Sequence, residues 1–233
     1  MFHKDIQKEI KVKTDLILPQ YKGKIETGGN IFHRKKNLNG SNVIFQSVLN
    51  YNVFPINCSL MISNDILSYN FATCSDWFKL SEIPNILIKI ENINFEAKQN
   101  DEYGRFQISN KNDIQIWVDN LKEIFDKEIE KTFLKYQNLN ELETLLNYNI
   151  LNFGESDISG IEIFLGLIAS KLLNKPYFEN MYENLNANFI KNEANFKGSI
   201  QYEMLNKVYS YLKTSEIEKL TNLEYLKSQF KNN

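Results

Sequence analysis

The sequence predicts an α+β fold in which an antiparallel sheet comes first and a helical region follows. Residues 37–64 contain no charged side chain and largely alternate in the period of two that is typical of β-strands. From about residue 111 onward the apolar residues recur at three and four positions, as in amphipathic helices. We therefore expect an N-terminal helix, a sheet of four to five strands and a long amphipathic helix, and then an all-α region of helical hairpins.

The first expected elements are a helix and a β-hairpin. An amphipathic helix covers residues 4–18 and ends at Pro19. Its apolar positions are Ile6, Ile10, Val12 and Ile17. Two strands should then flank a turn at Asn39-Gly40. Because lysine on an edge strand discourages pairing between sheets, we expect the basic run Arg34–Lys36 to lie on the outer strand, at the edge of the sheet.

Further strands are predicted before the next helix. Residues 53–62 alternate strictly, so that one face carries Phe54, Ile56, Cys58, Leu60 and Ile62. An uncharged edge strand promotes aggregation, so we expect this strand and the one before it to lie centrally. Residues 85–95 and 104–109 alternate in the same way. Residues 65–83 are expected to form a long loop or a short helix that contains Trp77 and Phe78.

The clearest helical pattern covers residues 111–136, with Asn110 or Asn112 as its N-cap and Asp113 in its first turn. A shorter helix follows over residues 140–150. Four more helices are expected, over residues 158–172, 176–189, 200–212 and 217–226, with short links that favour antiparallel hairpins. The chain is thus divided into an α+β domain, residues 1–150, and a helical region, residues 151–233. Whether the two share one core is left open.

Composition argues against several kinds of protein. The N-terminus has no secretory pattern, and the most apolar stretch, residues 161–173, is too short to span a bilayer and contains Glu162 and Lys171. We therefore expect a cytoplasmic protein that does not bind membranes. The chain has two cysteines and two histidines, without the spacing of a metal site. No metal, no cofactor and no catalytic residue is predicted.

Two groups of residues are candidates for a catalytic site. Cys74 and His33 would form a nucleophile and base if the fold brought them together, although an inert buried cysteine is the simpler interpretation. Glu155, Asp157 and Glu162 cluster at the start of a predicted helix, where the helix dipole favours acidic residues in any case. An enzyme of unrecognised, hydrolase-like type is therefore an alternative hypothesis.

Charge is distributed unevenly along the chain. Residues 1–60 carry nine Lys or Arg against four Asp or Glu, and the remainder carries 18 against 25. A nucleic-acid-binding accessory role through residues 24–36 is a further alternative hypothesis, which the acidic remainder of the chain opposes. The acidic part should instead attract a basic protein. The residues expected to contact such a partner are Glu155, Asp157, Glu162, Glu179 and Glu183.

Four short motifs within about residues 1–150 resemble those of a known family. They are Asn30-Ile31-Phe32-His33-Arg34, Val43-Ile44-Phe45-Gln46, Gly104-Arg105-Phe106 and the helix that begins near Asp113 and bears Trp117. In this order they resemble a family of uncharacterised bacterial proteins, a domain of unknown function. The family has no assigned catalytic residues. Because its members look like proteins encoded near polymorphic toxins, the resemblance implies an immunity or partner-binding role inside the cell.

The sequence therefore predicts a non-enzymatic, cytoplasmic, protein-binding protein, with an immunity protein that neutralises a basic toxin as the specific hypothesis. The identity of the partner and the oligomeric state are left open.

Overall fold

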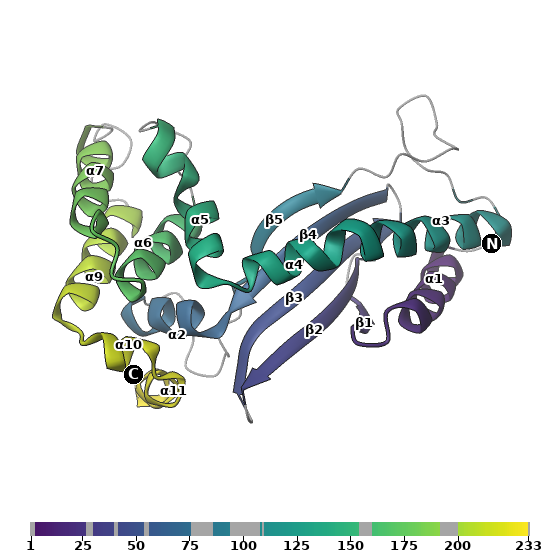
Figure 1. Cartoon of the computed structure of the whole chain (residues 1–233), viewed down its shortest axis with the longest axis horizontal. Coiled ribbons are helices and arrows are strands. Elements are labelled where there is room, and N and C mark those ends of the chain that lie inside the picture. Colours follow the sequence, from purple (N-terminus) through teal and green to yellow (C-terminus); the bar gives the residue numbers. More distant parts are fainter. Residues whose placement is uncertain are drawn as a thin grey trace. The chain divides into compact units, whose positions relative to one another are not determined.

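The helices and strands form two compact units, each built from two stretches of the chain. The computed structural model describes residues 3–26, 30–39, 42–53, 56–75, 86–93, 108, 110–153, 160–191 and 200–232 (Figure 1). The first unit comprises residues 1–63 and 87–136, and the second comprises residues 64–86 and 137–233. The predicted α+β class, with an N-terminal helix, an antiparallel sheet and a helical C-terminal region, is confirmed.

The sheet of the first unit has five strands in sequence order. They are β1 (Lys22–Ile25), β2 (Ile31–Asn39), β3 (Asn42–Val53), β4 (Ile56–Asn64) and β5 (Ile88–Ile93). β2 and β3 form the predicted hairpin, with Asn39 opposite Asn42. On its other side β2 pairs with β1, where Gly23 lies opposite His33. β2 is therefore an inner strand, and the prediction that it lies at the edge of the sheet is wrong, although β1 lies opposite residues 31–34 and not opposite Lys35 and Lys36. The four residues of β1, Lys-Gly-Lys-Ile, are too few to show a strand pattern in the sequence.

One face of this sheet is covered by helices (Figure 1). α1 (His3–Ile17) and α3 (Lys111–Ile124) contribute Ile10 and Trp117 to a core that also contains Ile31, Leu49, Tyr51 and Leu60 of the sheet. The buried side of α1 differs from the prediction, because Val12 is 59% exposed whereas Thr14 is fully buried. Ile6, Ile10 and Thr14 are spaced by four, and a threonine hydroxyl inside a helix can bond to the preceding turn.

The long helix predicted over residues 111–136 is present, and it contains one wider turn. α3, the π-helical turn η1 (Phe125–Ile129) and α4 (Glu130–Tyr136) follow one another directly. Asn110 caps α3 in a capping box with Asp113. The buried residues 117, 121, 125, 129 and 133 stand four apart, and each such step advances about 40° around an α-helix. An i→i+5 turn holds more residues, so it offsets this rotation and keeps Ile129 and Phe133 in the core.

The second unit is built around α6 (Glu162–Leu172). Every residue from Ile163 to Ser170 is buried, as expected of a helix enclosed on all sides. Its neighbours are α2 (Asp65–Cys74), α5 (Leu139–Phe153), α7 (Phe178–Lys191), α9 (Ile200–Thr214) and α10 (Ile217–Thr221). α11 (Leu223–Asn232) packs on α2 through Leu226 and Phe230.

Several boundaries differ from those expected. The division at residue 150 falls inside α5, which belongs wholly to the second unit, as does α2. Asn70 explains the position of α2, because its side chain donates to the Leu220 carbonyl and accepts from the Tyr211 hydroxyl. The last predicted helix is two helices, since the side chain of Asn222 caps α11. Trp77, Phe78, residues 104–107 and residue 109 lie outside the described part of the chain.

Candidate functional site

Of the five carboxylates predicted to contact a partner, two lie together on one exposed helix face. Glu179 and Glu183 stand one turn apart on α7, and both are exposed. Glu162 begins α6, a different helix, where its carboxylate lies so close to Gly160 that a Cβ would be 2.6 Å from Oε2. Glu155 and Asp157 lie outside the described residues.

A tyrosine cluster lies beside Glu179, between α7 and α9. The half-buried rings of Tyr182 and Tyr209 stack face to face, with centroids 3.5 Å apart. The hydroxyl of Tyr182 donates to the side-chain oxygen of Asn206 at 2.8 Å, and the hydroxyl of Tyr209 donates to the carboxylate of Glu179. We call Glu179, Tyr182, Glu183 and Tyr209 the α7–α9 face. It combines two exposed carboxylates with aromatic rings that are partly accessible.

The α7–α9 face already holds a cation of its own chain. The ammonium of Lys213 lies 3.1 Å from the Tyr209 hydroxyl oxygen and 5.3 Å from the centre of the ring. The pKa of Tyr209 lies above its ordinary value, mainly because its hydroxyl donates a hydrogen bond to Glu179. The contact with Lys213 acts to lower this pKa. The same contact with Tyr209 raises the pKa of Lys213. The face therefore stabilises positive charge.

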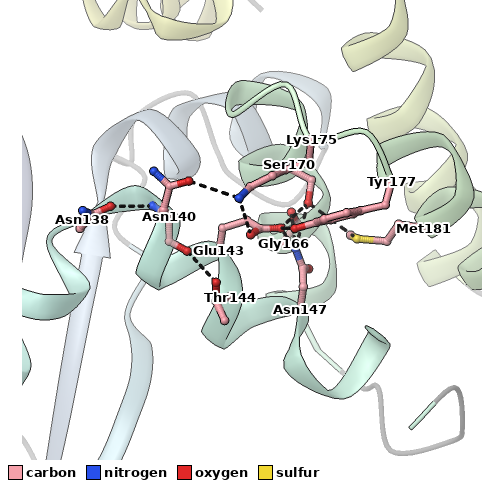
Figure 2. A network of polar contacts seen from close by, with 10 residues as sticks. All are labelled: Asn138, Asn140, Glu143, Thr144, Asn147, Gly166, Ser170, Lys175, Tyr177 and Met181. Carbon is pink, nitrogen blue, oxygen red and sulfur yellow. Dashed lines mark hydrogen bonds and ion pairs between the residues drawn. The ribbon is translucent and has the colours of Figure 1, made fainter. Parts of the chain in front are cut away.

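The interior of the same unit contains a polar network that the sequence did not predict (Figure 2). Its centre is the carboxylate of Glu143 on α5, which is 1% exposed. The side-chain amide of Asn147 donates to it at 2.6 Å, the hydroxyl of Ser170 at 2.8 Å and the hydroxyl of Tyr177 at 2.6 Å. The ammonium of Lys175 lies 3.6 Å from the other carboxylate oxygen. These contacts thus replace the hydrogen bonds to water that the carboxylate loses on burial.

This network positions the α7–α9 face. Lys175 and Tyr177 belong to the short link between α6 and α7, and both are bound to Glu143 (Figure 2). Glu179 lies only two residues beyond Tyr177. Burial and the neighbouring carboxylate of Glu143 raise the pKa of Tyr177, so its hydroxyl keeps the proton that it donates. The network therefore holds the start of α7 in place against α5.

One signal in the sequence could have indicated the network. Glu143 and Asn147 stand four residues apart, and each directly follows a buried leucine, Leu142 or Leu146. A carboxylate and an amide at helical spacing beside an apolar stripe indicate a buried polar pair. Their partner Ser170 belongs to a helix that is buried on all sides, and no spacing in the sequence links it to Glu143.

His33 lies in a second buried cluster, within the first unit. Its Nε2 is 2.9 Å from the hydroxyl of Thr14 and 3.0 Å from the hydroxyl of Tyr51, and its Nδ1 is 3.5 Å from Asp15 Oδ1. Burial lowers the pKa of His33 to about 4, although Asp15 acts to raise it. A Cβ on Gly23 would lie 2.6 Å from the imidazole Cε1, so glycine lets β1 pass this close to His33.

The order of Thr14, His33 and Asp15 is that of hydroxyl, imidazole and carboxylate in catalytic triads. A nucleophile must reach its substrate, and here both Thr14 and His33 are fully buried. The hydroxyl of Thr14 also donates to the Ile10 carbonyl at 2.8 Å. The cluster is therefore suited to joining α1, β2 and β3, with a neutral imidazole at its centre.

The hypothesis of a Cys74 nucleophile meets a chemical obstacle. The thiol of Cys74 donates to the carbonyls of Asn70 and Phe71 within α2, at 3.1 and 3.3 Å. Burial raises its pKa to about 12, which suppresses the thiolate that nucleophilic catalysis requires. His33, its predicted base, is bound to Thr14 and Tyr51.

Carboxylates of the first unit neutralise much of the basic run. Arg34 pairs with Glu26 at 3.1 Å, and Lys35 pairs with Glu130 at 3.6 Å. Both cations also lie over aromatic rings, those of Phe32 and Tyr21. Lys36 is exposed. This arrangement leaves little free positive charge on Arg34 and Lys35 for phosphates.

Within the described residues there is no group of three or more His, Cys, Asp or Glu side chains placed to hold a metal ion. None of the helices in this part of the chain is long and apolar enough to cross a membrane. Comparisons with protein-family models, with curated proteins and with solved structures find no match to this chain.

Proposed function

We propose that this protein is a cytoplasmic, non-enzymatic protein that binds and masks a basic protein partner, as an immunity protein does with a toxin. The observation that supports this most is the α7–α9 face, where Glu179 and Glu183 are exposed on the helix that carries Tyr182, and where Glu179 also binds the hydroxyl of Tyr209. Tyrosine is enriched at protein interfaces, where its ring supplies apolar contact and its hydroxyl a polar one. Carboxylates around such rings favour a partner of opposite charge.

The charge of the second unit supports the same proposal. It contains ten Lys or Arg residues against fifteen Asp or Glu, a formal net charge of −5. A field of one sign speeds the encounter with an oppositely charged protein. The rigid link through Glu143 and Tyr177 would hold the start of α7 ready for binding, which lowers the entropy lost on association.

The test is a binding measurement with the product of the adjacent gene. Both proteins are purified, and complex formation is followed by size-exclusion chromatography and isothermal titration calorimetry. Glu179→Gln/Glu183→Gln should weaken the complex about tenfold or more. A matched control, Glu218→Gln/Glu224→Gln, removes the same charge at the second residues of α10 and α11. It should change the affinity by no more than about twofold.

Two results would count against the proposal. One is the lack of any complex with the products of the adjacent genes. The other is an equal loss of affinity in the two double variants, because binding would then depend on net charge alone and not on the α7–α9 face.

A further inference from the structure

The contacts of Lys213 indicate which cation the α7–α9 face recognises. Lys213 lies in the last turn of α9 and its side chain is exposed. Its ammonium contacts both the ring and the hydroxyl of Tyr209, and that hydroxyl is bound to Glu179. The ammonium thus meets an aromatic ring and a hydroxyl oxygen, and that hydroxyl is in turn bound to a carboxylate. These are the groups that bind cationic side chains.

Lys213 is a weak occupant of this position. An exposed lysine loses the freedom of a long side chain when it is held, and water competes for its ammonium. Its own contacts are an ammonium–ring contact and one bond to a phenol oxygen. It therefore binds loosely enough for a better-fitting cation to replace it.

Arginine fits the position better than lysine does. A guanidinium donates two parallel hydrogen bonds to a carboxylate, and it is attracted to aromatic rings such as the one that the Lys213 ammonium approaches. Glu179 and Glu183 offer two such carboxylates one turn apart. We propose that the α7–α9 face binds an arginine side chain of the basic protein partner at the position that Lys213 occupies in the free protein. This inference rests on the proposed function, since it specifies the chemistry of that partner.

The test uses two blocked peptides, hexa-arginine and hexa-lysine, titrated into the full-length protein at low ionic strength. Hexa-arginine should bind more tightly. Lys213→Met should strengthen hexa-arginine binding about threefold, because it removes the competing ammonium. Lys219→Met is the matched control, since it removes the same charge from an exposed lysine of α10. Glu179→Gln should weaken the binding, and Glu224→Gln should not.

Equal affinities for the two peptides, or equal effects of Lys213→Met and Lys219→Met, would overturn the inference. Circular dichroism checks that each variant is folded, and the two lysine variants alter exposed side chains only. The two proposals fail differently. If the partner binds but Lys213→Met and Lys219→Met affect it equally, the function stands and the arginine site does not. If the peptides behave as expected but the adjacent gene products do not bind, the proposed function fails.

Discussion

The hydroxyl of Tyr177 donates a 2.6 Å hydrogen bond to the buried carboxylate of Glu143. This contact joins the residue just before α7 to α5, so it connects the α7–α9 face to the interior of the second unit. Because the same carboxylate oxygen accepts from Asn147 and Ser170, three parts of the chain converge on one charge. A change inside this network should therefore affect both stability and the exposed face.

Removing the Tyr177 hydroxyl tests that connection. Tyr177→Phe loses a hydrogen bond to a charged group, and we expect the free energy of unfolding to fall by about 1–2 kcal/mol, less than for a fully buried donor because Tyr177 is partly exposed. Urea denaturation followed by circular dichroism measures this. Tyr225→Phe, at a partly exposed tyrosine of α11 outside the network, serves as the control and should change stability by less than about 0.5 kcal/mol. Similar losses in both variants would argue against the network as an anchor.

Gly166 should be essential because of Asn147. A Cβ at Gly166 would lie 2.1 Å from Asn147 Oδ1, so Gly166→Ala should destabilise the protein by about 1–3 kcal/mol, although alanine is the better helix former. In an Asn147→Ala background the obstacle is absent, and Gly166→Ala should then be neutral or stabilising. Urea denaturation of all four proteins in this double-mutant cycle gives the coupling energy. A cost that is the same in both backgrounds would show that the clash is not with Asn147.

His33 should make the first unit sensitive to acid. Its pKa is about 4 in the folded protein against about 6.5 in an unfolded chain, so between these values the unfolded state binds more protons. Its contribution to stability is therefore complete above pH 6.5 and is lost as the pH falls towards 4, by about 3 kcal/mol in total. Denaturant midpoints between pH 7 and about 4 measure the effect.

Trp117 provides the signal for this experiment, because it packs on Tyr51 next to His33, with ring centroids 4.9 Å apart. In a Trp77→Phe background it is the only tryptophan of the chain. Carboxylates also titrate in this range, so the test is the difference between this protein and its His33→Gln variant. If both lose stability in parallel from pH 6.5 to 4, His33 is not the group responsible.

Cys74 should be chemically inert in the folded protein. With a thiol pKa of about 12, its thiolate fraction at pH 8 is about a thousandfold below that of an ordinary cysteine. In a Cys58→Ser variant, iodoacetamide should therefore alkylate Cys74 very slowly, and rapidly once guanidinium chloride unfolds the chain. Mass spectrometry measures both rates. Fast alkylation under native conditions would reopen the hypothesis of a reactive cysteine.

The start and the buried side of the long helix could be predicted from the sequence. Asn110 and Asp113 indicated where it begins, and the apolar residues from Ile114 to Phe133 indicated its buried side. The same residues also contained the evidence for the π-helical turn, in the repeated spacing of four after Trp117. Edge and inner strands were harder to tell apart, because β1 has one apolar residue and its pairing with β2 depends on contacts that no local pattern encodes.

The same contrast between local pattern and packing applies to the candidate site. Local spacing and composition were enough to predict the fold class, the hairpin of β2 and β3, most of the helices and the acidic character of the C-terminal part of the chain. The contacts of Glu179 with Tyr209, of Glu143 with Tyr177 and of His33 with Thr14 could not be predicted in this way, because they depend on how the elements pack. Each of these pairs is separated by at least 19 residues, and hydrogen bonds over such separations form only when packing brings helices and strands together.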